Sequence, residues 1–180
     1  MTIAEPCVFE FAETFNLAFK QKNTCLKPGA MEPFYRAPKA QAPAIIYSNQ
    51  DFFSSALHEV AHWCIAGEKR RQQDDYGYWY APAGRNHEQQ LAFYQVEVKP
   101  QALEWAFHLA ANWCFKPSLD NPGVDICLET VTSFKRQLHK QLSDYFEQGF
   151  PVAALEVIQL LCQQYRHGHA ISLPSLESIT

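Results

Sequence analysis

Two histidines and a glutamate lie close together in the run His58-Glu59-Val60-Ala61-His62. Four residues make about one helical turn, so in a helix the two imidazoles would share one face, roughly 5–6 Å apart. This is the H-E-x-x-H pattern, in which the histidines bind a divalent transition metal and the glutamate on a neighbouring face can act as a base. The run therefore predicts a metalloenzyme with His58 and His62 as ligands and Glu59 as a catalytic group.

The residues that flank the motif are mostly apolar, which predicts that its helix is buried. They are Phe52, Phe53, Leu57, Val60, Ala61, Trp63, Cys64 and Ile65. The alternative is an ordinary surface helix that carries these polar groups by chance. In a buried helix, an unpartnered His-Glu-His face would cost several kcal/mol of desolvation, which a bound metal ion offsets directly.

A third protein ligand is needed, because two histidines alone do not make a catalytic metal site. The candidates after the motif are Asp74, Asp75, His87, Glu88, Glu97 and Glu104. A carboxylate inside an apolar stretch needs a partner more than a surface carboxylate does, which narrows the choice to Glu97 and Glu104. The residues by themselves leave both open, because a glutamate at a helix N-terminus is also stable without a metal.

Helices dominate the predicted secondary structure. Apolar periodicity with proline and glycine boundaries predicts helices at 6–21, 86–96, 101–113, 125–147 and 151–168, besides a motif helix that Gly67 ends. Strands are predicted at 44–48 and 76–80, and prolines predict a loop over 24–44. The pattern indicates an α+β fold: one helix-dominated catalytic domain over 1–180 with a small β-sheet and a tail after about 168 that can be flexible.

Composition excludes several classes of protein. The chain has 180 residues, 47% of them hydrophobic, and a net charge of −4, which argues against general nucleic-acid binding. It has no signal-peptide pattern and no apolar run near the roughly 20 residues that a membrane span needs. The six cysteines form no C-x-x-C pair, so free thiols in a cytoplasmic protein are expected.

Three blocks of the sequence are similar to those of a known family. They are residues 55–67 around the motif, YGYWY at 76–80 and VEVKPQAL at 96–103. Together they resemble the elongation factor P hydroxylases, small bacterial enzymes that hydroxylate the modified lysine of that translation factor. The resemblance extends over most of the chain.

The resemblance implies a site, a substrate and a fold. It implies a metal held by His58, His62 and Glu97, and so it selects Glu97 over Glu104. The implied substrate is elongation factor P whose loop lysine already carries a lysyl extension, and the implied product is hydroxylated on the original lysine. The implied fold has a zincin-like arrangement of helices around the metal helix and is not a jelly roll.

Those ligands suit oxidative chemistry. Two imidazoles and one carboxylate on one face of Fe(II) leave the opposite face open for O₂ and water, whereas zinc has no accessible redox change. We therefore expect Fe(II), with O₂ as co-substrate; 2-oxoglutarate dependence stays open, because the sequence has no H-x-D…H pattern. The lysyl-lysine arm is cationic, so acidic or aromatic groups are expected at the entrance, from Glu59, Asp74, Asp75, Tyr78 and Tyr80.

Two other functions are compatible with the motif. One is a small zinc metallopeptidase, in which Glu59 would activate a zinc-bound water. The other is a binding module with a structural metal, in which the metal would have no open coordination position. A downstream glutamate as third ligand is common to hydroxylase and peptidase, so the spacing does not decide between them.

Overall fold

The computed structural model describes residues 5–77, 85–119 and 126–179. Its helices are α1 (Val8–Ala18), α2 (Phe53–Arg70), α3 (His87–Ala110), α4 (Leu128–Gln148) and α5 (Val152–Tyr165), with short 3-10 helices η1 (Lys20–Lys22), η2 (Asp74–Gly77) and η3 (Leu176–Ser178). Its strands are β1 (Thr24–Ala30), β2 (Phe34–Arg36) and β3 (Ala44–Asn49). The prediction of a helix-dominated α+β fold with a small sheet is therefore confirmed.

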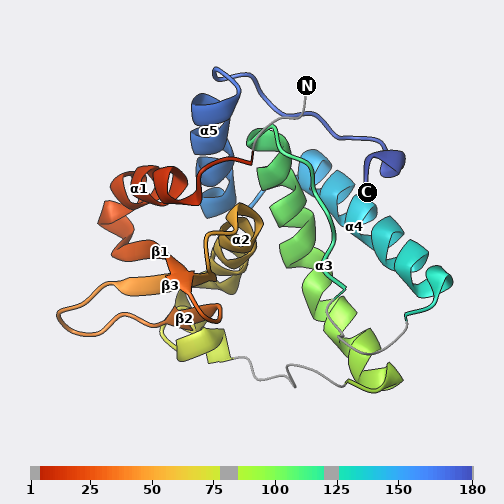
Figure 1. Cartoon of the computed structure of the whole chain (residues 1–180), viewed down its shortest axis with the longest axis horizontal. Coiled ribbons are helices and arrows are strands. Elements are labelled where there is room, and N and C mark those ends of the chain that lie inside the picture. Colours follow the sequence, from red (N-terminus) through yellow and green to blue (C-terminus); the bar gives the residue numbers. More distant parts are fainter. Residues whose placement is uncertain (1–4, 78–84, 120–125, 180) are drawn as a thin grey trace.

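The sheet has the strand order β1-β3-β2, with β3 parallel to β1 and antiparallel to β2. Buried residues alternate along β3 at Ala44, Ile46 and Ser48, as expected for a strand with one face in the core. Helix α1 packs on β1 and α2 packs on β3, while α3 lies between α2 and α4 (Figure 1). The motif helix is therefore enclosed by the sheet on one side and α3 on the other.

The prediction of a loop over 24–44 is wrong, because that segment contains β1 and β2. Pro28 is tolerated in β1 because this strand is at the edge of the sheet, where a missing N–H breaks no inner ladder. The pairing with β3 also shifts register between Lys27 and Ala30, around Pro28 and Gly29. Proline thus marks an edge strand with a bulge here, not the absence of a strand.

The predicted strand at 76–80 is wrong at its start, because Tyr76 and Gly77 belong to η2. The Tyr76 ring is buried and stacks on the Tyr35 ring, with centroids 4.2 Å apart. This contact fixes η2 against β2. The rest of the predicted strand, 78–80, lies outside the described residues.

Helix α3 joins two segments that were predicted as separate helices, and it runs unbroken through Pro100. Proline removes the N–H that would donate to the carbonyl of Val96, four residues earlier. Val96 is 44% exposed, so the turn that lacks this hydrogen bond lies at the surface. The consequence for function is that Glu97 lies inside a helix and not at a helix N-terminus.

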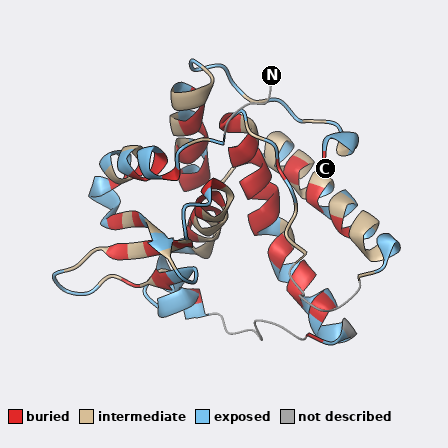
Figure 2. Ribbon diagram, in the orientation of Figure 1, coloured by how far each residue is buried: buried red, intermediate tan, exposed pale blue. Residues whose placement is uncertain are grey.

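An aromatic cluster holds α2 in place from the side opposite α3. The Trp63 ring meets Phe15 and Phe19 edge-on, with centroids 5.9 and 5.5 Å apart, and Phe53 meets Phe11 in the same way at 5.6 Å. All five side chains are buried, and the inward faces of α2 and α3 are buried along most of their lengths (Figure 2). Gly67 then interrupts α2 with φ 71° and ψ 169°, so the regular helix ends where the sequence predicted.

The C-terminal segment runs back from α5 toward α4 (Figure 1). His139 of α4 is 3.0 Å from the carbonyl oxygen of Pro174, Lys135 donates to the carbonyl of Ile179, and Ile179 is buried. The tail that was predicted to be flexible therefore has specific contacts with α4. Among the described residues, no helix combines the length and apolar character of a membrane span.

Replacing Phe15 by alanine should lower the free energy of unfolding by about 3–5 kcal/mol, because the ring contacts Phe19 and Trp63 and no water reaches the site. Leu17→Ala on the same helix is the matched control, since Leu17 is 78% exposed. Urea denaturation followed by circular dichroism measures both. Equal losses in the two variants would contradict the aromatic cluster as the support of α2.

Candidate metal centre

Helix α2 brings His58 and His62 onto the face that packs against α3. Their ring centroids are 4.7 Å apart and their Nε2 atoms are 3.1 Å apart. The four-residue spacing places the rings one above the other, and both rings turn their Nε2 atoms toward the same point. The two histidines that the sequence predicts as ligands therefore lie close together in the fold.

Glu97 of α3 faces the same point from the opposite helix. Its Oε1 is 3.3 Å from His62 Nε2 and its Oε2 is 3.6 Å from His58 Nε2. One ligand atom from each of His58, His62 and Glu97 can be chosen so that all lie within 4.8 Å of one another. Metal–ligand bonds of about 2.1 Å place neighbouring ligand atoms about 3.0–3.4 Å apart, so this donor set fits a divalent transition metal.

The electrostatics of the site favour a cation. Burial would raise the pKa of the Glu97 carboxyl, but the two imidazoles and the Gln101 amide outweigh burial and lower that pKa to about 2. Burial would lower the pKa of His58, but Glu104 and Glu97 outweigh it and raise that pKa to about 10. Two buried carboxylates thus need positive charge beside them, and a divalent cation can supply it.

Gln101 fixes the orientation of the Glu97 carboxylate. Its Nε2 donates to Glu97 Oε2 at 3.2 Å and to the carbonyl of Ser118 at 2.9 Å, and its Oε1 accepts from the Ser118 N–H at 3.0 Å. Sequence reasoning missed Gln101. A polar side chain one turn after Glu97, within an apolar stretch, was the signal that could have identified it.

Glu104, the other candidate for the third ligand, lies on the far edge of the His58 ring. Its Oε2 is 2.8 Å from His58 Nδ1, whereas the atoms that converge with Glu97 are the Nε2 atoms. Its Oε1 is 3.5 Å from His108 Nε2. The structure therefore brings Glu97 and not Glu104 to the point that both histidines face.

Glu59 follows His58 on α2 and lies on the neighbouring face of the helix. Burial raises the pKa of its carboxyl, and the positive charge of His58 and His62 offsets part of this rise. A raised pKa brings a carboxyl closer to the range in which it can act as a general acid or base. This arrangement is suitable for a base beside a metal site.

The predicted substrate-binding aspartates lie on η2. Asp74 Oδ1 accepts from the Ala37 N–H at 2.8 Å, and Asp75 Oδ1 accepts from the Tyr35 N–H at 2.9 Å. One oxygen of each carboxylate thus ties η2 to the β2 region. The other two predicted positions, Tyr78 and Tyr80, lie outside the described residues.

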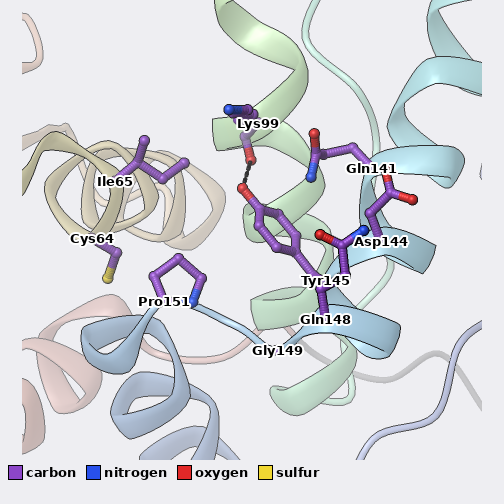
Figure 3. A pocket seen from close by; sticks show the side chains of 9 residues that line it. All are labelled: Cys64, Ile65, Lys99, Gln141, Asp144, Tyr145, Gln148, Gly149 and Pro151. Atoms are coloured by element: carbon purple, nitrogen blue, oxygen red, sulfur yellow. Dashed lines mark hydrogen bonds between the residues drawn. The ribbon is translucent and has the colours of Figure 1, made fainter.

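Two neighbouring cavities lie beside the site. The first, of about 290 Å³, has His62 and Glu97 in its wall together with the apolar side chains Ile65, Ala66, Val96 and Pro100. The second, of about 320 Å³, lies among α2, α3, α4 and the turn before α5, and the Tyr145 hydroxyl donates to the Lys99 carbonyl at its edge (Figure 3). Ile65 and Lys99 line both cavities, so the two adjoin.

Comparison with known proteins identifies a family. A family model described as Elongation factor P hydroxylase matches residues 11–174. The chain is also similar to a Haemophilus influenzae protein named elongation factor P lysine hydroxylase, at 40% identity over 169 residues, which cover 91% of this chain and 92% of that protein. The resemblance seen in the three sequence blocks is confirmed.

Alanine at His58, His62 or Glu97 should each abolish stable metal loading, because each change removes one of three converging donors. Metal content after anaerobic Fe(II) loading and desalting, in protein made without a histidine tag, measures this. Glu13→Ala and His169→Ala are controls at exposed positions and should retain full loading. Full metal content in Glu97→Ala would contradict the third-ligand prediction.

Proposed function

The chain belongs to the elongation factor P hydroxylase family, and we propose that it hydroxylates the lysyl-modified lysine of elongation factor P with Fe(II) held by His58, His62 and Glu97. The family match supports the reaction and the protein substrate. The observation that carries the proposal for the metal is the convergence of two Nε2 atoms and one buried carboxylate. The enzyme would be an O₂-dependent, monooxygenase-type oxidoreductase.

The donor set suits iron more than zinc for this reaction. Fe(II) bound by two imidazoles and one carboxylate supplies a redox-active centre with a face open to O₂, which zinc cannot supply. Hydroxylation places one oxygen atom of O₂ between carbon and hydrogen, and the other leaves as water after two electrons and two protons arrive from a reductant. The alternative, a zinc peptidase, uses the same ligands but needs no reductant.

Besides the metal ion, the proposed catalytic group is the side chain of Glu59. It follows His58 directly, and burial raises the pKa of its carboxyl, so it can hold or release a proton beside the reacting atoms. In the hydroxylase it would orient a water molecule or pair with an amine of the substrate. In a peptidase it would be the base that activates water.

The cavity beside His62 and Glu97 is the proposed position of the substrate arm. Its wall of Ile65, Ala66, Val96 and Pro100 suits the methylene groups of a lysine side chain, and the two site residues at its edge lie next to the proposed metal. The cationic groups of the arm would meet the predicted positions Asp74, Asp75, Tyr78 and Tyr80. Of these, the two aspartates each have one carboxylate oxygen that accepts a backbone N–H.

Three further parts of the proposal concern the whole chain. A zincin-like arrangement is supported by the packing of α2 between β3 and α3, which contributes the third ligand. A cytoplasmic location is supported by six free cysteines, since disulfides form in oxidising compartments. The expected catalytic unit is one domain over 1–180, with elongation factor P as partner and neither nucleic acid nor membrane.

The purified protein with Fe(II), a reductant and O₂ should add one oxygen atom to lysylated elongation factor P and none to the unlysylated factor. Intact-protein mass spectrometry followed by peptide fragmentation measures the added mass and its position. Glu97→Ala should give no addition, and Glu13→Ala should behave as the parent. Cleavage of a peptide bond in the factor, without added oxygen, would favour the peptidase instead.

Replacing Ala66 by leucine should raise the KM for the lysylated factor at least several-fold and leave metal content unchanged, because the larger side chain narrows the arm cavity without removing a donor atom. Ala18→Leu, at an exposed position of α1, is the matched control. Initial rates at varied substrate concentration separate KM from kcat. An unchanged KM in Ala66→Leu would place the arm elsewhere.

A further inference from the structure

A row of buried polar residues follows one face of α3. Glu97, Gln101, Glu104 and His108 are spaced by four, three and four residues, so they share a helix face, and each is at most 5% exposed. Burying so many polar groups in one row is costly unless each has a partner. Glu97 and Gln101 have partners already described, which leaves the role of the Glu104–His108 pair to be explained.

Glu104 determines which nitrogen of His58 carries a proton. Glu104 Oε2 lies 2.8 Å from His58 Nδ1, and a carboxylate can only accept, so Nδ1 must donate. In the neutral imidazole that binds a metal, the lone pair is then at Nε2, the atom that faces His62 Nε2 at 3.1 Å and Glu97. The contact thus selects the tautomer, and also the ring orientation, that a metal ligand requires.

The Glu104 carboxylate lies between His58 and a second histidine, His108. His108 Nε2 is 3.5 Å from its other oxygen, and the His108 ring is 1% exposed. The Phe115 ring lies edge-on to His108 with centroids 5.5 Å apart, and Trp105 stacks on Phe115 at 5.6 Å. Aromatic packing therefore limits the movement of the His108 ring, which borders the carboxylate on its Oε1 side.

We propose that Glu104 is a positioning residue of the metal centre: it holds the His58 imidazole so that Nε2 faces the metal, with His108 packed behind it. This inference rests on the proposed function only for the presence of a metal, and not for the substrate. Glu104 lies on the Nδ1 edge of the ring and is not a metal ligand. Its loss should weaken metal binding without removing any donor atom.

The competing explanation is an ordinary buried ion pair that joins α2 to α3. Breaking such a pair lowers stability, but it does not selectively change the affinity for a metal. Two measurements therefore separate the explanations. If Glu104 positions His58, its loss raises the metal dissociation constant; if it only forms an ion pair, its loss lowers just the melting temperature of the metal-free protein.

The decisive variant is Glu104→Gln, which keeps the shape of the side chain and removes its charge. Metal affinity for Zn²⁺ and Co²⁺, measured by competition with a chromophoric chelator, should fall about 10–100-fold. Glu13→Gln, the same change at an exposed position, should leave affinity unchanged. Wild-type affinity in Glu104→Gln, with only a lower Tm of the stripped protein, would overturn the proposal.

A second measurement separates this proposal from the proposed function. With lysylated elongation factor P, Glu104→Gln should lower kcat at limiting Fe(II), with partial recovery at high Fe(II) and an unchanged KM for the factor. A parent protein that binds metal but does not hydroxylate the factor would overturn the proposed function and leave the affinity test intact. A parent protein that binds no metal would overturn both.

Discussion

The contact between α2 and α3 is the constraint on which the site depends. It places two imidazoles opposite two carboxylates. Water does not solvate the carboxylate charges well there, since Glu97 and Glu104 are 3% and 5% exposed. Burial would raise the pKa of both carboxyl groups, but the neighbouring imidazoles lower it, and the carboxylates in turn raise the pKa of His58. Two buried carboxylates require positive charge beside them. A divalent cation at the Nε2 atoms would supply two positive charges, whereas one protonated imidazole supplies one.

The rest of the fold keeps the two helices at this distance. On the side of α2 away from α3, Trp63 packs against the phenyl rings of α1, and β3 packs along the same helix. On the other side, α4 and α5 pack on α3. Since α2 cannot shift without opening the aromatic cluster, the distance between His62 and Glu97 is set by the core and not by the site residues alone.

The sequence predicted the parts of this site that depend on local spacing. The pair His58 and His62 follows from one helical turn, and the helix-dominated α+β fold follows from apolar periodicity and glycine boundaries. The choice between Glu97 and Glu104 did not follow, because both lie on the same face of α3, seven residues or about 10.5 Å apart along the axis. Which glutamate meets the Nε2 atoms depends on how far α3 is shifted along its axis relative to α2. Only the resemblance to the family selected Glu97.

Proline caused two of the other failures of prediction, the missed strands in 24–44 and the division of α3. Pro28 and Pro100 were expected to interrupt secondary structure. However, Pro28 lies in an edge strand and Pro100 lies inside α3. In both places the missing N–H is harmless, because an edge strand has a free side and the Val96 carbonyl lies on an exposed part of the helix. Exposure of a backbone group is a tertiary property, so no local pattern in the sequence could show it.

The two histidines are not equivalent once the helices have packed. His58 is backed on Nδ1 by Glu104, whereas the described residues supply no such carboxylate behind His62. His62 and Glu97 instead form part of the wall of the cavity of about 290 Å³, which Gln95 and Lys99 also line. One histidine thus has a carboxylate behind it within the interface, whereas the other borders a cavity, so the α2–α3 contact makes the two sides of the candidate centre chemically different.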